Sequence, residues 1–532
     1  MKKLQVWLPL LFAVVMMIGM LIGFRLRENV HPPGFFLTRK QTPVEEVEDL
    51  INMKYMDSVS KDSLGNNAIE GMLAHLDPHS MYIPAVEVPE VNEDLQGNFE
   101  GIGVEFQIFD DTVNVTNVLA GGPSDKAGLQ TGDKFLKVGD SVVAGNGISN
   151  DRIRKLLRGP GASSVTITLL RVGQPAKLLH IPVTRGMIPL PSVDVAYMIN
   201  KETGYIRIGK FSETTHAEFA QALMKLQKDG LQRLILDLRG NGGGILQESI
   251  EIADDFLDGD KLIVYTVGVR SPKVEYRCRR DGLFEKGKLA LLTDEGTASA
   301  SEVLTGALQD WDRATVIGRR TFGKGLVQEQ YQLSDGSALR LCVARYYTPT
   351  GRSIQKPYDK GHDDYNEEVM KRFHDGEVLH GDTTAKHAGP AFKTLGPEKR
   401  TVYGGGGITP DIFIGFDTST LSRGSMTLYV DGTLNRFVYT YYVQHLSAFQ
   451  AFKGPADFAA NYHDDEGLWK ALISYAARDT VNLGSIPARE KQVLQRRLKA
   501  LLARQIWRTE GYYEVSNAFD PVISKALEVV DK

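Results

Sequence analysis

The pattern of hydrophobic and polar positions changes several times along the chain. Residues 4–24 form an apolar run that is interrupted only by Gln5. Residues 42–95 repeat apolar positions at helical spacing, whereas residues 99–185 alternate apolar and polar positions in short runs that are typical of strands. This pattern predicts an apolar N-terminal helix, then a helical region, then a small β-rich domain.

From residue 187 onward the pattern predicts an α/β core, because strands and helices alternate. Residues 203–211 and 233–238 are predicted strands, and residues 214–230 between them are a predicted helix that a glycine ends. A polar, charged segment over residues 357–400 breaks the alternation, and its scattered histidines favour an irregular surface insertion over a metal site. These histidines are His362, His374, His380 and His387.

The C-terminal region, from about residue 417, is predicted to be helical. An apolar stripe within residues 488–507 is more typical of packing on the same protein or on a second copy than on a membrane, so a homodimer is one expectation. With 532 residues the chain is too long for one core. The predicted parts are residues 1–28, 29–97, 98–186, 187–416 with its insertion, and 417–532.

The N-terminal apolar run is long enough to cross a membrane. Its 21 residues would span about 31 Å as a helix, close to the hydrocarbon thickness of a bilayer. Basic residues flank both ends, and no small-residue cleavage site follows. We therefore expect an uncleaved signal anchor, with the body of the chain outside the cytoplasm in the periplasmic part of the cell envelope. A cleaved signal peptide is the alternative and implies the same location.

Composition changes this picture little. The net charge of -4 gives no reason to expect a basic face for a nucleic acid. Cys278 and Cys342 form no CxxC pair, so they are either one disulfide or two thiols. Neither a metal site nor a cofactor is expected.

The stretch EGTASASEV, residues 295–303, places hydroxyl side chains among small residues just before a helical pattern. A helix N-terminus favours a nucleophilic serine, because free N–H groups and the helix dipole stabilise developing negative charge. Ser299 and Ser301 are the candidates. A capping role is the alternative, since Ser299 and Glu302 have the spacing of a capping box.

Lys324 is the titratable group that the chain would bring to this serine. A helix over residues 299–311 and a returning strand over residues 314–321 cover similar lengths, which places Lys324 at the level of the helix start. Gln328, four residues later, would face the same side of a strand. Because burial disfavours the charged form of a lysine, Lys324 can act as a general base in place of a histidine.

The sequence DLRGNGGG, residues 237–244, follows a predicted buried strand. Its glycines would expose N–H groups at the carboxyl edge of the sheet. Together with the N–H of the residue after the nucleophile, they could form an oxyanion hole. A phosphate loop or a tight turn would use the same glycines, although no GK[ST] motif follows, which argues against a nucleotide P-loop.

The segment PSDKAGLQTGDKFLKVGD, residues 123–140, resembles part of a PDZ domain that would cover residues 98–185. This resemblance implies binding of an extended peptide by strand addition, with backbone N–H groups on its terminal carboxylate. Residues 101–104 match the loop that binds the carboxylate in a PDZ domain, and their glycines let a ligand approach the backbone closely. In the alternative interpretation, these glycines only shape a turn. The loop residues are Gly101, Ile102, Gly103 and Val104.

The chain resembles the carboxy-terminal processing proteases from about residue 66 to residue 411, without the insertion. Six motifs occur in the order found in that family: GIGVEF, AGLQTGD, LDLRGNGGG, TASASE, GKGLVQ and GGGGITPD. The resemblance implies an α/β protease core of the ClpP/crotonase-like class, with an inserted PDZ domain and helical N- and C-terminal regions.

The same resemblance implies a role for each site residue. Ser299 would be the nucleophile, Lys324 the general base and Gln328 the support of the lysine. Thr297 stands where the family has the first serine of a Ser-Ala-Ser-Ala-Ser run, a departure that leaves the nucleophile in place. The oxyanion donors would be Ala300 together with Gly242 or Gly243. Arg158 would couple PDZ ligand binding to the active site.

The leading hypothesis is an exported serine endopeptidase that recognises the C-terminal tails of proteins through its PDZ domain and cleaves peptide bonds by a Ser–Lys dyad. One alternative is a Ser-His-Asp hydrolase, with His216 as base and Asp237 or Asp294 as its orienting group. Another alternative is a scaffold that binds such tails without cleaving them.

Overall fold

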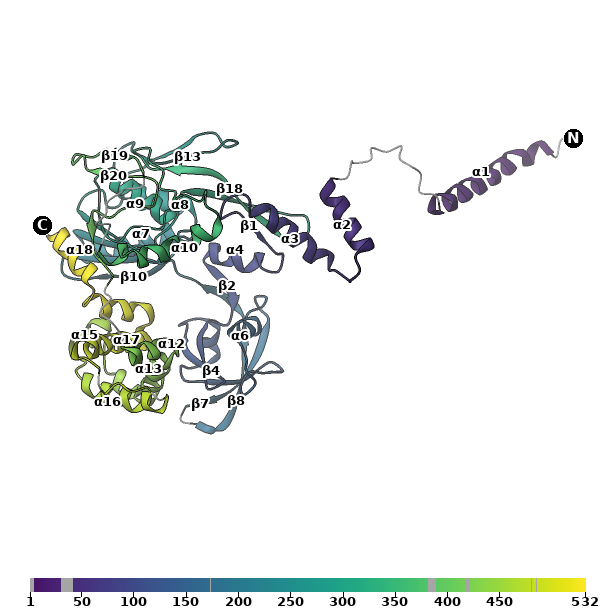
Figure 1. Ribbon diagram of the computed structural model, residues 1–532. Helices are drawn as coiled ribbons and strands as arrows, with labels where there is room; N and C mark the ends of the chain where they lie inside the picture. The colour runs from purple at the N-terminus through teal and green to yellow at the C-terminus, as the bar shows by residue number, and fades with distance from the viewer. Residues whose placement is uncertain are drawn as a thin grey trace. The chain divides into compact units, whose positions relative to one another are not determined.

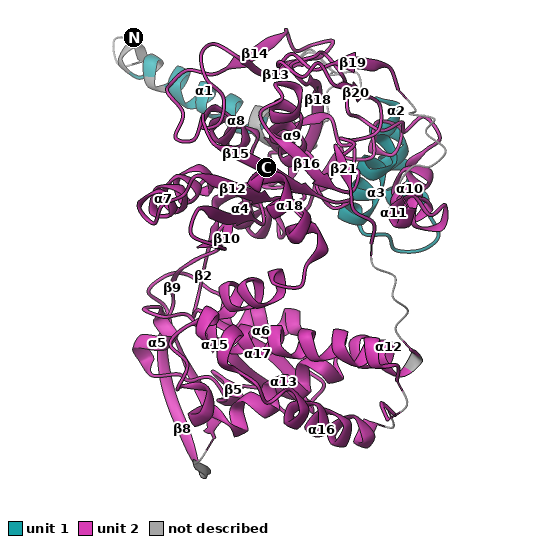
Figure 2. Ribbon diagram, turned by 90° about the vertical axis from the view of Figure 1, so that its left-hand side faces the viewer, with its two compact units in different colours: residues 1–72 teal, residues 73–532 magenta. Residues whose placement is uncertain are grey.

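The computed structural model describes residues 4–29, 42–172, 174–380, 389–416, 422–479, 481–484 and 486–532 (Figure 1). The chain divides into two compact units, residues 1–72 and residues 73–532 (Figure 2). Along the chain, helical, β-rich, α/β and again helical segments follow one another in the predicted order.

The first unit is helical. Its elements are α1 (Leu4–Asn29), α2 (Pro43–Lys54) and α3 (Lys61–Leu73). A capping box begins α2, because the backbone N–H groups of Thr42 and Glu45 each donate to the side chain of the other residue. Within the residues described, no helix is both long enough and apolar enough to cross a bilayer. The predicted anchor over residues 1–28 is therefore not supported.

The segment that resembles a PDZ domain forms an antiparallel sheet in the order β3-β4-β5-β7-β8, with β6 paired to β5. Strand β3 lies at one edge of this sheet, so an added strand could pair with its free side. Two short helices and a separate ribbon of β2 and β9 accompany the sheet. The bounds are β2 (Asn98–Gly101), β3 (Val104–Phe109), β4 (Thr112–Val118), α5 (Pro123–Ala127), β5 (Lys134–Val138), β6 (Ser141–Val142), α6 (Asn150–Leu157), β7 (Ser164–Arg171), β8 (Gln174–Thr184) and β9 (Gly186–Pro189).

The α/β core is built on a sheet in the order β10-β11-β12-β15-β16-β21, parallel from β11 onward. Buried residues of α7, α8 and α9 pack on one face of this sheet. Strands β12 and β15 are parallel neighbours, so the loops that follow them meet at the same edge. The bounds are β10 (Val193–Met198), β11 (Thr203–Ile208), α7 (Thr215–Lys228), β12 (Arg233–Asp237), α8 (Leu246–Asp254), β15 (Lys288–Thr293), α9 (Ala300–Asp310), β16 (Thr315–Gly318) and β21 (Ile412–Phe413).

A second sheet stands beside this core. Its order is β1-β18-β13-β14, and β17 also pairs with β18. Because β17 follows β16 closely in the chain, the second sheet receives the segment that begins just after Lys324. The bounds are β1 (Met81–Ile83), β13 (Leu262–Val267), β14 (Val274–Arg277), β17 (Leu326–Gln332) and β18 (Ala338–Tyr347), with α4 (Val88–Gln96) after β1.

The insertion at residues 357–400 is ordered rather than irregular, which corrects the prediction for its described residues. It contains the helices α10 (His362–His374) and α11 (Glu377–His380) and the strand β19 (Ala391–Lys393), which pairs with β20 (Thr401–Tyr403) just after the insertion. His387 lies outside the described residues.

The C-terminal helices form a cluster of their own, except for the last one. Buried apolar residues of α12 to α17 pack together, whereas Val522, Ile523 and Val530 of α18 pack on the core sheet. The helix α18 thus covers the face of that sheet opposite α9. The bounds are α12 (Arg423–Val430), α13 (Thr433–Gln444), α14 (Leu446–Phe449), α15 (Pro455–Asn461), α16 (Asp465–Ala476), α17 (Ala488–Asn517) and α18 (Pro521–Asp531). The possible homodimer stays a prediction.

Candidate active site

Ser299 lies in the connection between β15 and α9, directly before the helix. Its backbone has a φ of 56° and a ψ of -118°, a conformation that costs a non-glycine residue about 1–3 kcal/mol. Two contacts hold it: the Ser299 N–H donates to the Glu302 carboxylate at 2.9 Å, and the Tyr346 hydroxyl hydrogen-bonds the Ser299 carbonyl at 3.1 Å. The half-buried serine is thus held at the start of the helix.

Lys324 and Gln328 lie together, as the sequence predicts. The Lys324 Nζ donates to Gln328 Oε1 at 2.7 Å, and Gln328 Nε2 donates to the His79 carbonyl at 2.7 Å. Burial lowers the pKa of Lys324 below its ordinary value, which favours the neutral amine. Lys324 itself lies in the loop before β17 rather than in a strand. Within the described residues, its Nζ bonds Gln328 and no hydrogen bond joins it to the Ser299 hydroxyl.

Glu302 joins the serine segment to the lysine loop. Its fully buried carboxylate accepts hydrogen bonds from the N–H groups of Ser299, Gly323 and Lys324 and from the Thr321 hydroxyl, at 2.5–2.9 Å. Burial raises the pKa of Glu302 to about 7, although these hydrogen bonds oppose the shift. The sequence indicated Glu302 only as a capping residue, so its second set of partners was missed.

Tyr346 of β18 forms a second link between the two segments. Its hydroxyl hydrogen-bonds the carbonyls of both Ser299 and Lys324, and its side chain is 2% exposed. No motif marked this residue in the sequence, because it belongs to the second sheet and reaches the site only through the fold.

The glycine loop after β12 packs directly against Ser299. A Cβ on Gly243 would lie 2.7 Å from the Ser299 Cβ and 2.9 Å from the Ala300 nitrogen, so no larger residue fits. The Gly243 N–H donates to Asn241 Oδ1 at 2.9 Å. Of the predicted oxyanion donors, the N–H groups of Gly242 and Ala300 are therefore the ones that meet no acceptor among the described residues.

Asp237 fixes the base of this loop. It is fully buried and accepts hydrogen bonds from the Tyr205 hydroxyl and the Arg239 guanidinium, both at 2.7 Å, with Arg207 3.1 Å away. Burial alone would raise the pKa of Asp237, but the two guanidiniums outweigh it and lower the pKa. Arg239 also bonds Asp520, just before α18, at 2.7 Å. Asp237 is therefore an ion-pair partner here.

His216 does not take part in a catalytic triad in this structure. Its Nε2 lies 3.0 Å from Asp255 Oδ2 and 3.0 Å from an Arg280 nitrogen. Among the described residues, neither Asp237 nor Asp294 hydrogen-bonds His216. The Ser-His-Asp alternative thus lacks its geometry.

His79 is partly buried in the turn before β1. The turn that Asp77 forms holds it in place, since Asp77 Oδ1 accepts from the His79 N–H at 2.9 Å. The His79 Nε2 lies 2.7 Å from the Tyr365 hydroxyl, and the His79 carbonyl holds Gln328. Burial, assisted by the charge of Lys324, lowers the pKa of His79 to about 4. A neutral histidine therefore belongs to the surroundings of the lysine.

The predicted carboxylate loop lies between β2 and β3. Gly101 ends β2, Val104 begins β3, and Gly103 has a φ of 74° that favours glycine. The carbonyls of Ile102 and Gly103 accept hydrogen bonds from Ser124 and Leu119. No acceptor faces the N–H groups of Ile102 and Gly103 within the described residues, which leaves them free for a ligand.

Arg158 follows α6 of the PDZ-like segment and contacts α4. Its guanidinium lies 3.1 Å from Glu93, 3.5 Å from Glu90 and 4.8 Å from the centre of the Phe99 ring. Arg158 therefore connects the PDZ-like segment to the helix that follows β1, and it lies apart from the carboxylate loop's own hydrogen bonds.

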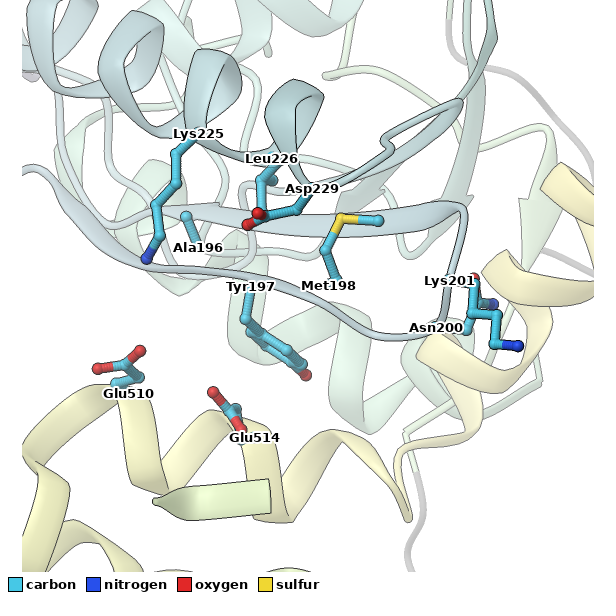
Figure 3. Close-up of a pocket in the computed structure, with 10 residues that line it drawn as sticks. All are labelled: Ala196, Tyr197, Met198, Asn200, Lys201, Lys225, Leu226, Asp229, Glu510 and Glu514. Carbon is cyan, nitrogen blue, oxygen red and sulfur yellow. The ribbon is translucent and has the colours of Figure 1, made fainter. Parts of the chain in front are cut away.

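The described residues form neither a metal site nor a disulfide. In the described ranges, no three His, Cys, Asp or Glu side chains are grouped to hold a metal, and Cys278 and Cys342 are free thiols. A cavity of about 530 Å³ lies between β10, α7 and α17 and is lined by Tyr197, Lys225 and Glu514 among others (Figure 3). None of the candidate site residues lines it, so the candidate chemistry is elsewhere.

Comparison with known proteins supports a protease. The model of peptidase family S41 matches residues 202–361, a PDZ domain model matches residues 115–171, and a family of unknown function, DUF8443, matches residues 426–508. The last match ends at a kink inside α17, where Trp507 and Arg508 leave helical geometry.

Among curated proteins, the probable CtpA-like serine protease of Staphylococcus haemolyticus is 33% identical over 66% of this chain and 71% of its own length. That of Staphylococcus aureus strain N315 is 36% identical over 58% of this chain and 62% of its own length, so the chain spans under two thirds of this relative. A solved structure, the photosystem II D1 C-terminal processing protease, is 26% identical over 71% of this chain and 87% of its own, with a TM-score of 0.36. The chain belongs to the C-terminal processing proteases of peptidase family S41.

Proposed function

We propose that this chain is a serine endopeptidase that uses Ser299 as nucleophile and Lys324 as general base. The observation that carries the proposal is the Lys324 amine: burial lowers its pKa, Gln328 holds it at 2.7 Å, and Glu302 fastens its loop to the backbone of Ser299. A lysine in such a setting can be neutral near physiological pH and accept a proton.

The reaction would proceed through an acyl-enzyme. Ser299 Oγ attacks the carbonyl carbon of the scissile bond while Lys324 Nζ takes the hydroxyl proton, and the N–H groups of Ala300 and Gly242 stabilise the oxyanion. The C–N bond then breaks, and the lysine ammonium returns the proton to the leaving amine. Water attacks the ester while Lys324 Nζ accepts its proton. The ester C–O bond then breaks and the lysine ammonium gives this proton to Ser299 Oγ, which releases the acid and restores both the serine hydroxyl and the neutral amine.

The substrate would be a protein with an exposed C-terminal tail. The edge strand β3 offers a free side for strand addition, and the N–H groups of Ile102 and Gly103 could take the tail's carboxylate. Because Arg158 bonds α4 rather than this loop, we assign it to the link between PDZ-like segment and core.

The direct test is to trap the acyl-enzyme. The full chain is mixed with an unstructured protein that ends in an apolar tail, quenched in acid within one turnover and digested for mass spectrometry. We expect an acyl adduct on the peptide that contains Ser299. The amount of new C-terminal fragments should then rise over time relative to the amount of this adduct. Absence of both cleavage and adduct would refute the proposed activity.

Gly243→Ala is expected to reduce hydrolysis by roughly 100-fold, because a Cβ there would displace Ser299 and the Ala300 N–H from the oxyanion position. Gly230→Ala is the matched control: Gly230 has nearly the same φ, 99° against 96°, but its nearest neighbour would be 3.5 Å from the new Cβ. Both variants should lose stability in thermal unfolding because of their positive φ, and Gly243→Ala should lose more because only its Cβ would lie within 3 Å of other atoms. Only Gly243→Ala should lose activity. Equal activity of the two would argue against this placement of the loop.

A further inference from the structure

The insertion helix α10 turns two buried side chains toward the candidate site. Tyr365 is 2% exposed and Arg372 is 3% exposed, while Glu367 and Met370 between them are exposed. Residues 365 and 372 are seven positions apart, which places them on the same side of a helix, two turns from each other. A buried tyrosine hydroxyl and a buried guanidinium require hydrogen-bond partners.

Arg372 finds its partners on the loop that carries the lysine. Its guanidinium donates to the carbonyls of Arg320 at 3.2 Å, Thr321 at 2.8 Å and Phe322 at 3.1 Å. These three residues directly precede Gly323 and Lys324, whose N–H groups donate to Glu302. The loop is therefore held from its carbonyl side by α10 and from its N–H side by α9.

Tyr365 reaches the same lysine by a different route. Its hydroxyl lies 2.7 Å from His79 Nε2, the His79 carbonyl accepts from Gln328 Nε2 at 2.7 Å, and Gln328 Oε1 accepts from Lys324 Nζ at 2.7 Å. The two rings also meet edge to face, with centroids 5.2 Å apart. Each hydrogen bond fixes the next group, so a change at Tyr365 is transmitted to the orientation of Gln328.

Lys356 fastens α10 to the loop at a third point. Its backbone N–H donates to the Gly323 carbonyl at 2.9 Å, and its Nζ donates to the Tyr365 carbonyl at 3.0 Å. The same ammonium lies 3.2 Å from Glu368 and over the rings of Phe322, at 3.9 Å, and Tyr365, at 4.1 Å. The contact between α10 and the loop is therefore specific and polar.

We propose that α10 is a brace for the general base, and that Tyr365 and Arg372 are positioning residues for Lys324 and Gln328. The catalytic part of this inference rests on the proposed function, because it concerns the same lysine. The insertion is then a part of the catalytic machinery that lies outside the family motifs, rather than a surface decoration.

The test compares two variants with two controls in the full chain. Tyr365→Phe removes one hydroxyl and keeps the ring, and Arg372→Met removes the donors and keeps most of the side-chain length. Met370→Ala changes an exposed position of the same helix, and Tyr442→Phe removes a hydroxyl within the C-terminal cluster. Thermal unfolding establishes that each variant is folded; should Arg372→Met fail, Tyr365→Phe alone still decides.

Amide hydrogen exchange is the first readout, because it needs no activity. We expect peptides covering residues 320–325 to exchange roughly 10-fold faster in Arg372→Met, and peptides covering residues 77–83 to exchange faster in Tyr365→Phe, with both controls unchanged. Unchanged exchange in both variants would overturn the brace, whether or not the wild-type chain hydrolyses peptides.

Steady-state kinetics is the second readout. We expect kcat to fall roughly 10- to 100-fold in the two variants with KM within about threefold, since the base is misplaced and the tail site is untouched. The rising limb of kcat against pH should also move to higher pH, because water that reaches Lys324 favours its charged form. Every variant keeps the charged and titratable groups that face Lys324. These groups are Glu302 of α9, Arg340 and Cys342 of β18, and Asp77 and His79 of the turn before β1.

These outcomes separate the two proposals. Faster exchange with unchanged kcat and an unchanged pH profile would refute the positioning role and leave the proposed function intact. A wild-type chain that forms no acyl-enzyme would refute the proposed function, and hydrogen exchange alone would then decide whether α10 braces the loop.

Discussion

Ser299→Ala is expected to reduce peptide hydrolysis by about 10,000-fold or more, because the proposed acyl-enzyme forms on the Ser299 hydroxyl. The change removes one oxygen and keeps the Cβ that packs against the glycine loop. The strained backbone at this position is held by Glu302 and Tyr346 through main-chain groups, so the substitution leaves both links in place. Hydrolysis of a tail-bearing protein, followed by mass spectrometry of the fragments, measures the loss.

Ser301→Ala is the matched control for this prediction. Ser301 is fully buried, and its hydroxyl donates to the Asn241 carbonyl at 3.0 Å. Its loss should therefore loosen the glycine loop slightly and lower activity less than about 10-fold. Ser299→Ala should still bind a fluorescent tail peptide with unchanged affinity. Activity that survives in Ser299→Ala but disappears in Ser301→Ala would identify the other serine as the nucleophile.

The parts of the site that follow local rules could be predicted from the sequence. Ser299 stands at a helix start, and Glu302 joins the backbone N–H groups of Ser299 and Lys324. That the Lys324 amine reaches the Ser299 hydroxyl stays a prediction. The pairing of Lys324 with Gln328 was predicted from their four-residue spacing in a strand, and the contact forms although Lys324 lies in the loop before β17. Each inference used neighbours in the chain and the geometry of regular elements.

The parts that depend on long-range packing could not be predicted. Tyr346 and His79 reach the lysine through the second sheet and its first strand, and neither lies in a motif whose spacing points to Lys324. The polar composition of the insertion predicts that its side chains are exposed to solvent, whereas Tyr365 and Arg372 are buried. Polar side chains can be placed in a core only when their partners are known, and those partners lie about 50 or more residues away in the chain.

The C-terminal region is helical, as predicted, and its last helix also belongs to the surroundings of the candidate site. Asp520 accepts from Arg239, which holds Asp237 under the glycine loop, and α18 covers the core sheet. Arg508, with a φ of 58° at the kink of α17, donates to Glu105 of β3 at 2.6 Å. The C-terminal chain therefore touches both the strand expected to receive a tail and the loop expected to hold the oxyanion.

Lys324→Arg is expected to reduce kcat by about 1,000-fold, within the range that general base catalysis contributes. Arginine keeps a positive charge and can still donate to Gln328, but its guanidinium does not become neutral in a protein and so cannot accept the serine proton. The substitution thus separates a base from a cation that merely supports the loop. Retention of activity in Lys324→Arg would exclude the general-base role.

The pH dependence of the wild-type chain provides the companion measurement. Only the neutral amine accepts a proton, so kcat should rise with pH and level off above the pKa of Lys324. Because burial places this pKa below that of an ordinary lysine, the plateau should begin at a lower pH than an exposed lysine would give. Gln328→Leu removes the oxygen that accepts a hydrogen bond from the ammonium form, so it should lower the pKa further while misplacing the amine. We therefore expect Gln328→Leu to have a smaller kcat and a rising limb of kcat against pH that lies at lower pH. A rising limb that moves to higher pH instead would show that Gln328 acts on Lys324 in some other way.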